Sequence, residues 1–409
     1  MENNRICVIG GGAAGMMAAG TAVLYGADVT IFESMTHLGK KLAITGKGRC
    51  NVTNNCSVNE FLDNVTKNPR FLYGALNAFS TDDTINHFES LGVPLKTERG
   101  KRVYPVTDRA KDIVDAMRKY SSQAKVIFKK VTSLKKNDNG FTVGAGGETY
   151  SFDKVIFATG GKSYPLTGSD GSGYRLATKL GHHITELLPS LIPLESDSPL
   201  CSEMQGLSLK NIGIKIIDDT NKIIYTDFGE MLFAHFGVTG PVILSASAHL
   251  RNFDISALTL SIDLKPALDE QTLDARLLSD FKAKNNRDLI NAMGALLPSK
   301  MIAPFIKATG INERKKINSI TKEERYKILT LLKDFRIPLK CFRPISEAII
   351  TSGGVDTKEI SPKTMESKIV PGLFFAGEII DVDAYTGGFN LQIAFSTGYL
   401  AGKSAAEIY

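Results

Sequence analysis

The chain has 409 residues, 37 of them glycine, and contains no tryptophan. Apolar residues make up 43% and charged residues 22%, a globular composition that excludes a disordered chain, a collagen-like repeat and a disulfide scaffold. The 49 Lys and Arg residues outnumber the 43 Asp and Glu residues. We interpret this as a mild excess spread along the chain, which permits anionic ligands but is too weak to predict nucleic-acid binding.

The cysteines and the N-terminal segment bear on location. Five cysteines, an odd number in a long chain, favour a cytoplasmic protein with reduced thiols. Residues 6–27 carry no charged side chain, but Gly10, Gly11, Gly12 and Gly15 interrupt this segment. The pattern therefore disfavours both a signal peptide and a membrane span. We expect a cytoplasmic protein that makes no membrane contact.

The first elements along the chain predict an α/β fold. Residues 5–9 (RICVI) predict a buried strand, the run that follows predicts a helix, and residues 28–32 (DVTIF) predict a second strand. This is a βαβ unit, whose crossover we expect to be right-handed. Further strands are predicted at 124–128 and 154–158, and the alternating runs between them predict a meander.

A change in composition marks an insertion. The segment 241–352 contains only two glycines, although glycine is frequent on both sides of it. Residues 207–263 contain strand-like runs, and residues 269–334 predict helices, with a capping box from Thr321 to Glu324. The sequence thus predicts one nucleotide-binding domain, split in sequence, that holds an inserted module of strands followed by helices.

The glycine turn after the first strand predicts a dinucleotide site. Residues 10–15 (GGGAAG) satisfy G-x-G-x-x-G between a strand and a helix. Gly10 allows the tight turn, Gly12 lets the backbone approach a pyrophosphate, and Gly15 lets the helix and strand pack closely. Glu33, at the end of the second strand, is placed to accept hydrogen bonds from ribose hydroxyls. The alternative is a tight strand–helix turn that binds no ligand.

Two later glycine signals favour FAD over NAD. Residues 158–161 (ATGG) end a strand, where small residues let the chain pass close to a dinucleotide. Residues 372–378 (GLFFAGE) predict an apolar strand that ends in a glycine and an acid, and residues 387–390 (GGFN) open a helix. That second helix N-terminus can face the flavin or the pyrophosphate, and Glu378 can bond the ribityl chain. Each segment alone also fits an ordinary strand–turn–helix junction.

Longer motifs carry a family resemblance. They are GKKLAITGKGRCNVTN (39–54), VYPVTDRA (103–110), ATGGKSYPLTGSDGSGY (158–174), MLFAHFGVTGP (231–241), ITSGGV (350–355) and TMESKIVPGLFFAGEIIDVDAYTGGFNLQIAFSTGYLAG (364–402). Over nearly its whole length the chain resembles the bacterial NAD(P)/FAD-dependent oxidoreductases, which include aminoacetone oxidases and bile-acid 3-oxo-Δ4,6 reductases. Ala384 and the pair Ser169–Asp170 depart from the family pattern, which puts the substrate in doubt rather than FAD binding.

The resemblance implies an α/β fold, with a Rossmann-like FAD-binding domain split in sequence, an inserted β-barrel-like module and a helical cap. On this basis the FAD-binding domain spans 1–190 and 348–409. The β-barrel-like domain spans 191–265 and 335–347, and the helical insert spans 266–334.

The resemblance also implies that Lys41, Arg49, Cys50 and Asn51 lie along the FAD. A glycine loop that carries basic residues suits an anionic pyrophosphate, although it is also consistent with a basic surface loop. The full set of expected cofactor-binding residues is Gly10, Gly12, Ala13, Ala14, Gly15, Glu33, Ser34, Lys41, Gly48, Arg49, Cys50, Asn51, Val131, Thr159, Gly160, Gly161, Gly377, Glu378, Gly388, Phe389, Asn390 and Leu391.

Cys50 and Cys56 permit a second interpretation, a redox-active disulfide next to the flavin. Flavin disulfide reductases carry such a pair in a loop after the fingerprint, with the spacing C-x4-C. The spacing here is C-x5-C, and the family motif accounts for Cys50 alone. We therefore disfavour a redox disulfide.

Four residues in the family motifs are candidates for catalysis: Tyr164, His235, Tyr385 and Arg109. Each can orient a carbonyl group or relay a proton, and packing roles remain open for all four. His235, in a phenylalanine-flanked run, fits a structural histidine at least as well. We expect His182 and His183 to be surface residues at a helix end, and no metal ligand set accompanies them.

Together these features predict an FAD-dependent oxidoreductase. We assign the one dinucleotide fingerprint to FAD. NAD(P)H, if used, therefore binds transiently as a co-substrate. The leading hypothesis is a reductase that uses NAD(P)H to reduce the conjugated C=C bond of an apolar carbonyl compound, such as a steroid enone. The alternatives are an oxidase of a small amine that uses O2, and a non-redox flavoprotein that acts on RNA or serves as a scaffold. We expect a small-molecule substrate and no nucleic-acid partner, and the oligomeric state stays open.

Overall fold

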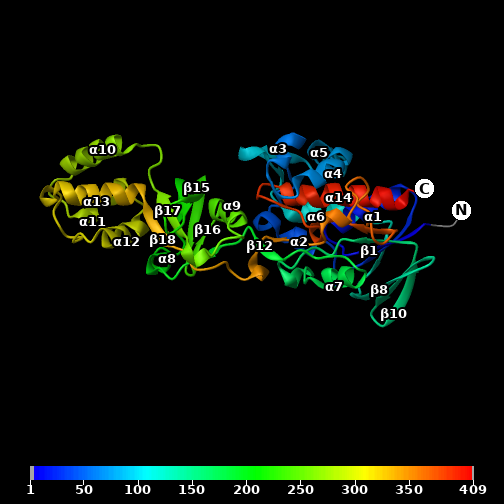
Figure 1. Cartoon of the computed structure of the whole chain (residues 1–409). Helices are drawn as coiled ribbons and strands as arrows, with labels where there is room; N and C mark the ends of the chain where they lie inside the picture. Colours follow the sequence, from blue (N-terminus) through cyan, green and yellow to red (C-terminus); the bar gives the residue numbers. More distant parts are fainter. Residues whose placement is uncertain (1–3, 408–409) are drawn as a thin grey trace. The chain divides into compact units, whose positions relative to one another are not determined.

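The computed structural model describes residues 4–407, and the chain forms two compact units. The first unit joins Met1–Ser190 to Pro344–Tyr409, and the second is the intervening Leu191–Arg343 (Figure 1). The second unit ends at Arg343. One reason is that Ser346 accepts a hydrogen bond from the N–H of Tyr164, which belongs to the first unit (3.1 Å).

A parallel sheet forms the centre of the first unit. Its five strands follow the order β20-β11-β1-β2-β7, and all neighbouring strands run parallel. Their bounds are β1 (Arg5–Ile9), β2 (Asp28–Phe32), β7 (Lys125–Ile127), β11 (Lys154–Phe157) and β20 (Leu373–Phe375). Because β20 pairs with β11, the C-terminal segment completes the sheet that the N-terminal segment begins. The predicted α/β fold, with a Rossmann-like domain split in sequence, is confirmed.

Helices α1 (Ala13–Leu24) and α14 (Phe389–Ala406) pack against each other through glycines. A Cβ atom at Gly398 would lie 2.5 Å from the carbonyl oxygen of Ala14, and one at Gly402 would lie 2.3 Å from that of Ala18. Only residues without a Cβ atom permit this approach. Figure 1 shows the two helices, in blue and red, side by side.

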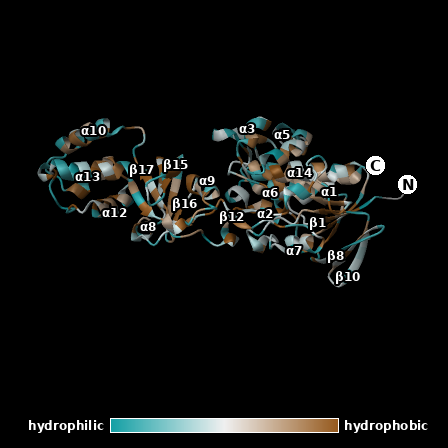
Figure 2. Ribbon diagram, in the orientation of Figure 1, coloured by the Kyte–Doolittle hydropathy of each residue, from teal (hydrophilic) through white to brown (hydrophobic). Residues whose placement is uncertain are grey.

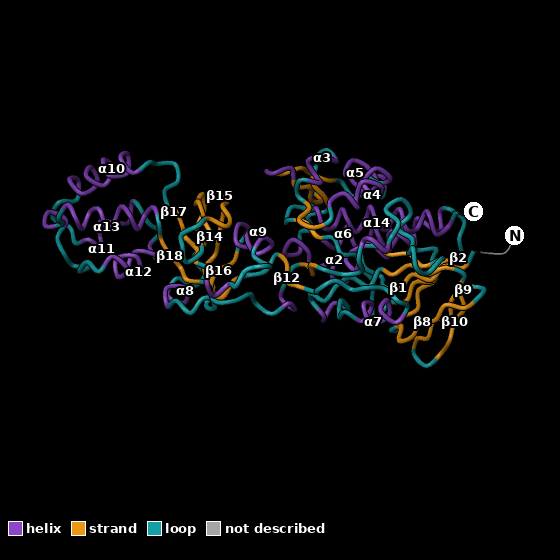
Figure 3. The backbone as a smooth tube through the Cα atoms, viewed as in Figure 1, coloured by secondary structure: helices purple, strands orange, loops and turns teal. Residues whose placement is uncertain are grey.

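The other elements of the first unit surround this sheet. An antiparallel meander consists of β8 (Val131–Asn137), β9 (Gly140–Ala145) and β10 (Glu148–Phe152), as predicted. Helix α6 (Ala110–Tyr120) packs beside α1. The remaining helices and strands are short: α2 (Lys40–Ile44), β3 (Thr53–Asn54), α3 (Val58–Leu62), β4 (Val65–Lys67), α4 (Tyr73–Ala78), α5 (Thr81–Ser90), β5 (Leu95–Glu98), β6 (Arg102–Pro105), α7 (Ser172–Lys179), β12 (Leu188–Ser190), β19 (Ile350–Ser352) and β21 (Asp383–Ala384) (Figure 3).

The second unit contains a six-stranded antiparallel sheet that closes on itself. Its order is β13-β16-β15-β14-β17-β18, with bounds β13 (Leu194–Glu195), β14 (Ser208–Ile217), β15 (Ile223–Ala234), β16 (Gly237–Thr239), β17 (Thr259–Asp263) and β18 (Phe335–Pro338). The N–H of Glu195 in the first strand donates to the carbonyl of Cys341 (2.9 Å), just beyond the last strand. The N–H of Lys340 returns a hydrogen bond to the carbonyl of Glu195 (2.8 Å). The sheet is therefore barrel-like.

Helices extend this second unit. They are α8 (Pro199–Glu203), α9 (Pro241–His249), α10 (Glu270–Ala283), α11 (Leu289–Ala292), α12 (Ser299–Thr309) and α13 (Lys322–Lys333). Thr321 and Glu324 form the predicted capping box at the start of α13. Leu277, Phe305 and Leu332 belong to the buried core of this unit, whereas α10 also carries many polar residues (Figure 2).

The two units have the same net charge of +3, with 28 basic and 25 acidic residues in the first and 21 and 18 in the second, but basic residues gather in one segment of the second unit. Residues 282–340 contain fourteen Lys and Arg residues but only five Asp and Glu residues, a surplus larger than the net charge of +6 for the whole chain. The rest of the chain therefore carries a slight excess of acidic residues. The net charge is thus divided evenly between the two units, and the surplus in the helical insert and the last strand of the barrel is a local one.

No helix within residues 4–407 is both long and apolar enough to cross a membrane. The uncharged stretch 6–27 forms most of β1, the glycine turn and α1 instead.

Candidate active site

The glycine turn between β1 and α1 is shaped by close backbone packing. Gly10 has φ +105°, and a Cβ atom there would lie 2.4 Å from the carbonyl oxygen of Ala158. A Cβ atom at Gly15 would lie 1.9 Å from the carbonyl oxygen of Gly10. Gly12 differs, because no atom lies within 4 Å of a Cβ atom built there. Gly12 is the N-cap of α1 and provides no side-chain cap, so the N–H groups from Ala13 onward are available to a phosphate.

Glu33 at the end of β2 is held against this turn. Glu33 is 8% exposed, and its carboxylate accepts hydrogen bonds from the N–H groups of Gly11 and Met35, both at 2.8 Å. The hydroxyl of Ser34 also donates to it (3.2 Å). A Cβ atom at Gly168 would lie 3.5 Å from Glu33 Oε1, so the loop of the 158–174 motif passes close to this carboxylate. The backbone therefore fixes the orientation of the acid that we expect to bind ribose.

The segments that follow β11 and β20 meet near the same turn. A Cβ atom at Gly377 would lie 2.8 Å from the Cβ atom of Ala14 in α1. A Cβ atom at Gly161 would lie 2.8 Å from Oε1 of Glu378. The N–H of Gly377 donates to the hydroxyl of Thr397 in α14 (3.0 Å). The fold thus brings together the three glycine signals that lie far apart in the sequence.

Within residues 4–407, three buried oxygen atoms in these motifs have neither a hydrogen-bond partner nor an ion pair: Asn51 Oδ1, Thr159 Oγ1 and Ser169 Oγ. Buried polar atoms in proteins are ordinarily hydrogen-bonded, so such a group of exceptions calls for an explanation. A Cβ atom at Gly160 would lie 2.7 Å from Ser169 Oγ, so a larger residue there would crowd this hydroxyl. The hydroxyl groups, phosphates and ring nitrogens of FAD offer suitable partners. Together with the open space at Gly12, these residues fit the cofactor.

Lys41 and Glu378 form the charged centre of the region. The ammonium of Lys41 lies 2.8 Å from Glu378 Oε2 and donates to the hydroxyl of Ser163 (2.8 Å). Ser163 donates in turn to Glu378 Oε1 (3.0 Å), and the N–H of Thr351 donates to the same oxygen (3.0 Å). The hydroxyl of Tyr174 donates to the backbone carbonyl of Glu378 (3.2 Å), and burial raises the pKa of this tyrosine. The network thus links α2, the 158–174 motif, β19 and the segment that follows β20.

Arg49 has carboxylate partners within the protein. Its guanidinium binds Glu98 and Asp108, each with a shortest contact of 2.6 Å, and lies 4.2 Å from the ring centre of Tyr104. Hydrogen bonding to Arg49 lowers the pKa of Glu98. Hydrogen bonds from Lys96, and then from Arg49, lower the pKa of Asp108. The guanidinium thus fixes the loop that contains Cys50 and Asn51, and its assignment to FAD stays a prediction.

Cys50 and Cys56 are both free thiols. Burial raises the pKa of Cys50 to about 12 and is the main cause that raises the pKa of Cys56 to about 11. Both thiols are therefore protonated at neutral pH. A reactive redox cysteine has the opposite property, a lowered pKa.

The N-terminus of α14, the second helix N-terminus expected near the cofactor, packs against β3. Gly388, the N-cap of α14, has φ +98°, and a Cβ atom there would lie 2.3 Å from the carbonyl oxygen of Thr53. The side chain of Asn390 accepts a hydrogen bond from the N–H of Ala384 (2.9 Å) and donates to its carbonyl (2.7 Å). Asn390 therefore holds the preceding turn. The other expected cofactor residues here and in β8 are buried or half-buried: Phe389, Leu391 and Val131.

The four candidate catalytic residues differ in their surroundings. Tyr164 is 36% exposed and has φ +52°, and Tyr385 is half-buried against the core. Arg109 is exposed at the N-cap of α6 and lies 3.3 Å from Asp112. His235 is exposed and belongs to the second unit, where its ring lies 5.1 Å from that of Phe236.

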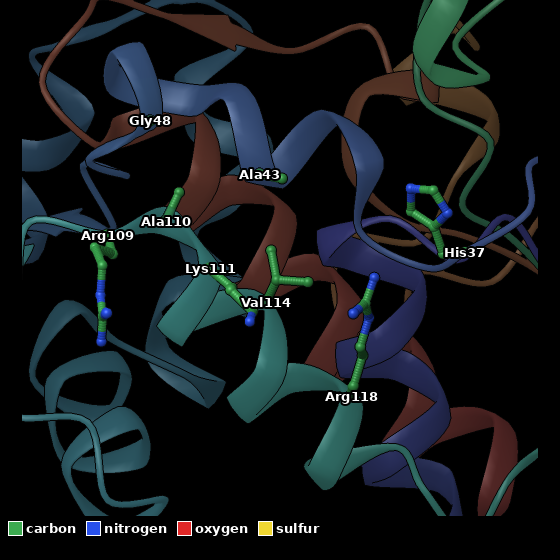
Figure 4. Close-up of a pocket in the computed structure, with 8 residues that line it drawn as sticks. All are labelled: His37, Ala43, Gly48, Arg109, Ala110, Lys111, Val114 and Arg118. Carbon is green, nitrogen blue, oxygen red and sulfur yellow. The ribbon is translucent and has the colours of Figure 1, made fainter.

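Arg109 borders a groove between α2 and α6, shown in Figure 4. The groove has a volume of about 580 Å³. Its lining residues are His37, Ala43, Gly48, Arg109, Ala110, Lys111, Val114 and Arg118. Gly48 belongs to the loop expected along the FAD, so the groove borders that loop.

His182 is not a surface residue, contrary to expectation. It is 3% exposed, with Nδ1 2.9 Å from Glu359 and Nε2 2.9 Å from the hydroxyl of Ser367. Burial lowers the pKa of His182. His183 is exposed, as expected. Within residues 4–407, no cluster of three or more His, Cys, Asp or Glu side chains is arranged to hold a metal ion.

Asp383 is a site feature that the sequence reasoning missed. Its carboxylate is fully buried and accepts hydrogen bonds from the hydroxyls of Thr66 (2.9 Å), Ser190 (2.8 Å) and Ser352 (3.0 Å). Ser190 and Ser352 stand on β12 and β19, so Asp383 ties together the strands where the chain leaves and re-enters the first unit. The acid within the apolar run IIDVDAY was the available signal.

Comparison with known proteins supports these observations. The HI0933-like protein Rossmann domain matches residues 4–404. The chain is 30% identical over 414 residues to the 3-dehydro-bile acid delta(4,6)-reductase of Clostridium scindens, covering 99% of each chain. It is also 30% identical over 403 residues to the ribosomal RNA dihydrouridine synthase of Escherichia coli, covering 98% of this chain and 97% of the other.

Among solved structures, the 3-ketosteroid delta1-dehydrogenase of Sterolibacterium denitrificans has a TM-score of 0.54 at 12% identity. The match covers 99% of this chain and 100% of that one, which shows a shared fold. From the family match and the full-length identities, the chain belongs to the HI0933-like Rossmann family and is an FAD-dependent oxidoreductase.

Proposed function

We propose that the protein is a reductase that adds hydrogen across a C=C bond conjugated to a carbonyl group, with NAD(P)H as the electron donor. The observation that carries this proposal is the 30% identity to the bile acid reductase along 99% of both chains. The name of the Escherichia coli relative fits the same chemistry. The C5=C6 bond of uridine is conjugated to a carbonyl, and its reduction gives dihydrouridine.

The net reaction consumes NAD(P)H, a proton and the unsaturated substrate. It breaks the C=C π bond, forms two C–H bonds and releases NAD(P)+. When bound, FAD supplies the two-electron chemistry that links the two substrates. The groups of the protein bind and orient them.

We assign the chain's own residues as follows. The turn at Gly12 and the first N–H groups of α1 bind the pyrophosphate, and Glu33 binds the ribose. Lys41 and Glu378 hold the strand ends together beside the cofactor. Tyr164 and Tyr385 are our candidates for the proton donor, because both belong to the first unit and carry a hydroxyl in a family motif.

Anaerobic flavin spectroscopy tests the proposal. We expect purified protein to be yellow, NADPH or NADH to bleach the flavin, and a 3-oxo-Δ4 steroid to restore its colour without O2. The steroid product should gain two hydrogen atoms by mass spectrometry. A protein that NAD(P)H does not bleach, but that a small amine bleaches and O2 re-oxidises, would be the oxidase of our alternative.

A uridine within RNA is a second candidate substrate, favoured by the charge distribution. The exposed side chains in residues 282–340 that form no ion pair within the described part of the chain include Lys282, Arg287, Arg314 and Lys322. Phosphate backbones bind such surfaces with strong salt dependence. This argues against our expectation that nucleic acid is not a partner.

The two candidates separate in one assay. Reduced protein is mixed with either the steroid or a ribosomal RNA transcript, and the digested RNA is searched for dihydrouridine by mass spectrometry. Re-oxidation by RNA alone, lost when all four basic residues are changed to Gln, would select the RNA substrate. Re-oxidation by the steroid alone would select the small molecule.

A further inference from the structure

The groove between α2 and α6 is a candidate binding site that shares one lining residue, Gly48, with the residues expected to bind FAD. Four of its eight lining residues are basic and none is acidic: His37, Arg109, Lys111 and Arg118. All eight residues belong to the first unit. Its volume, about 580 Å³, lies within the range of small-molecule sites, roughly 300–1,000 Å³.

The groove combines an apolar floor with positive charge. Ala43, Ala110 and Val114 provide the apolar contacts between the basic side chains (Figure 4). Arg109 is the N-cap of the eleven-residue helix α6 and makes no side-chain cap, so the N–H groups of Ala110 and Lys111 also favour an anion here, although Asp112 already places one carboxylate in this turn.

The basic groups are only partly neutralised. Arg109 and Arg118 have weak contacts with Asp112 (3.3 Å) and Asp115 (3.5 Å), and Lys111 forms no ion pair within residues 4–407. Arg118 also donates to the carbonyl of Leu38 (2.7 Å), which fixes the guanidinium beside the groove. A flat apolar ring over the floor, with phosphate groups on both sides, would satisfy this arrangement.

We propose that the groove binds the adenosine end of NADPH, with the basic side chains holding its 2′-phosphate and pyrophosphate. The sequence contains one dinucleotide fingerprint, which we assign to FAD. A nicotinamide dinucleotide therefore needs a different kind of site. The groove borders the loop at Gly48 that leads to Arg49, Cys50 and Asn51. This inference rests on the proposed function only in taking a nicotinamide dinucleotide as the donor. It adds the location of the site and the preference for the 2′-phosphate.

Calorimetry with the FAD-loaded protein tests the site directly. The probe is adenosine 2′,5′-bisphosphate, compared with 5′-AMP and inorganic phosphate. We expect the bisphosphate to bind at least tenfold more tightly than 5′-AMP. The variant Lys111→Gln/Arg118→Gln should weaken the bisphosphate at least tenfold and leave FAD content unchanged. The control Lys135→Gln/Lys179→Gln removes the same charge at exposed positions outside the groove and should have no effect.

Lys111→Gln alone guards against misfolding, because Lys111 forms no ion pair in the described part of the chain, whereas Arg118 donates a hydrogen bond to a backbone carbonyl. It should raise the NADPH concentration for half-maximal flavin bleaching without changing the limiting rate. Equal bisphosphate binding by the double variant and the control would overturn the site. So would groove-dependent binding of an RNA oligonucleotide without binding of the bisphosphate. If the bisphosphate binds in the groove but NADPH never bleaches the flavin, the proposed electron donor fails and the site stands.

Discussion

The ammonium of Lys41 lies 2.8 Å from the carboxylate of Glu378, although 337 residues separate the two in the sequence. Lys41 stands on α2, the short helix that follows β2, and Glu378 follows β20, the last strand of the parallel sheet along the chain. Both side chains are mostly buried, with 25% and 16% exposure. The pair therefore closes the split domain at the place where the cofactor motifs meet.

Loss of this pair should weaken both the fold and FAD retention. Lys41→Met removes the counter-charge from a largely buried carboxylate, so we expect a loss of about 2 kcal/mol in the free energy of unfolding, less than for a fully buried pair. The dissociation constant for FAD should rise at least tenfold. Urea unfolding and flavin fluorescence quenching measure the two effects. The double variant Lys41→Met/Glu378→Gln should lose less stability than the two single changes summed, and strict additivity would contradict a direct coupling.

Alanine substitutions at two glycines of the fingerprint should have different effects: Gly15→Ala should lower stability, whereas Gly12→Ala should weaken FAD binding. In Gly15→Ala the new Cβ atom meets the Gly10 carbonyl at 1.9 Å, so we expect a loss of about 1–3 kcal/mol in unfolding free energy. In Gly12→Ala it meets no protein atom within 4 Å, so the apo protein should keep its stability while FAD binds at least tenfold more weakly. Thermal unfolding of apo protein and FAD titration separate these outcomes. A normal FAD affinity in Gly12→Ala would remove the pyrophosphate assignment.

Local patterns in the sequence predicted several elements in both units. The strands β1 and β2, the glycine turn and the capping box at Thr321 depend on neighbours within a few residues, and each formed as expected. The same reasoning missed contacts between distant segments. Arg49 binds Glu98 and Asp108 across separations of 49 and 59 residues, and no local pattern in the sequence links these groups.

Local sequence patterns also did not predict which polar side chains are buried. His182 is adjacent to the exposed His183, yet Glu359 and Ser367 enclose it from the C-terminal part of the chain. Asp383 is buried because three hydroxyls from separate strands surround it. Such environments are set by tertiary packing, which a single sequence does not reveal.

Glu33→Gln tests the ribose assignment. The amide keeps the size of the side chain and one acceptor oxygen, so it should retain one of the hydrogen bonds from Gly11 and Met35. A ribose hydroxyl loses a charged acceptor, whose hydrogen bonds contribute about 1.5–3 kcal/mol, so we expect FAD to bind roughly ten- to a hundredfold more weakly. Fluorescence titration measures this constant. Thr36→Ala, which removes an exposed hydroxyl of the same loop, serves as the control, and an equal effect in both variants would argue for a general disturbance of the turn.

Cys50 should make stability fall at alkaline pH. Burial raises the pKa of its thiol from 9.0 to about 12, so the folded and unfolded chains bind the same number of protons at this group below pH 9. Between pH 9 and 12 the unfolded chain releases a proton that the folded chain keeps, and the free energy of unfolding falls by about 1.4 kcal/mol per pH unit from this group. Cys50→Ser removes the ionisable group, so its unfolding free energy should fall less steeply, by one proton. Urea unfolding at several pH values gives both slopes. The contributions of other titrating groups are the same in both proteins and cancel in the comparison. Identical slopes of unfolding free energy against pH would therefore mean that the Cys50 thiol ionises equally in the folded and unfolded chains.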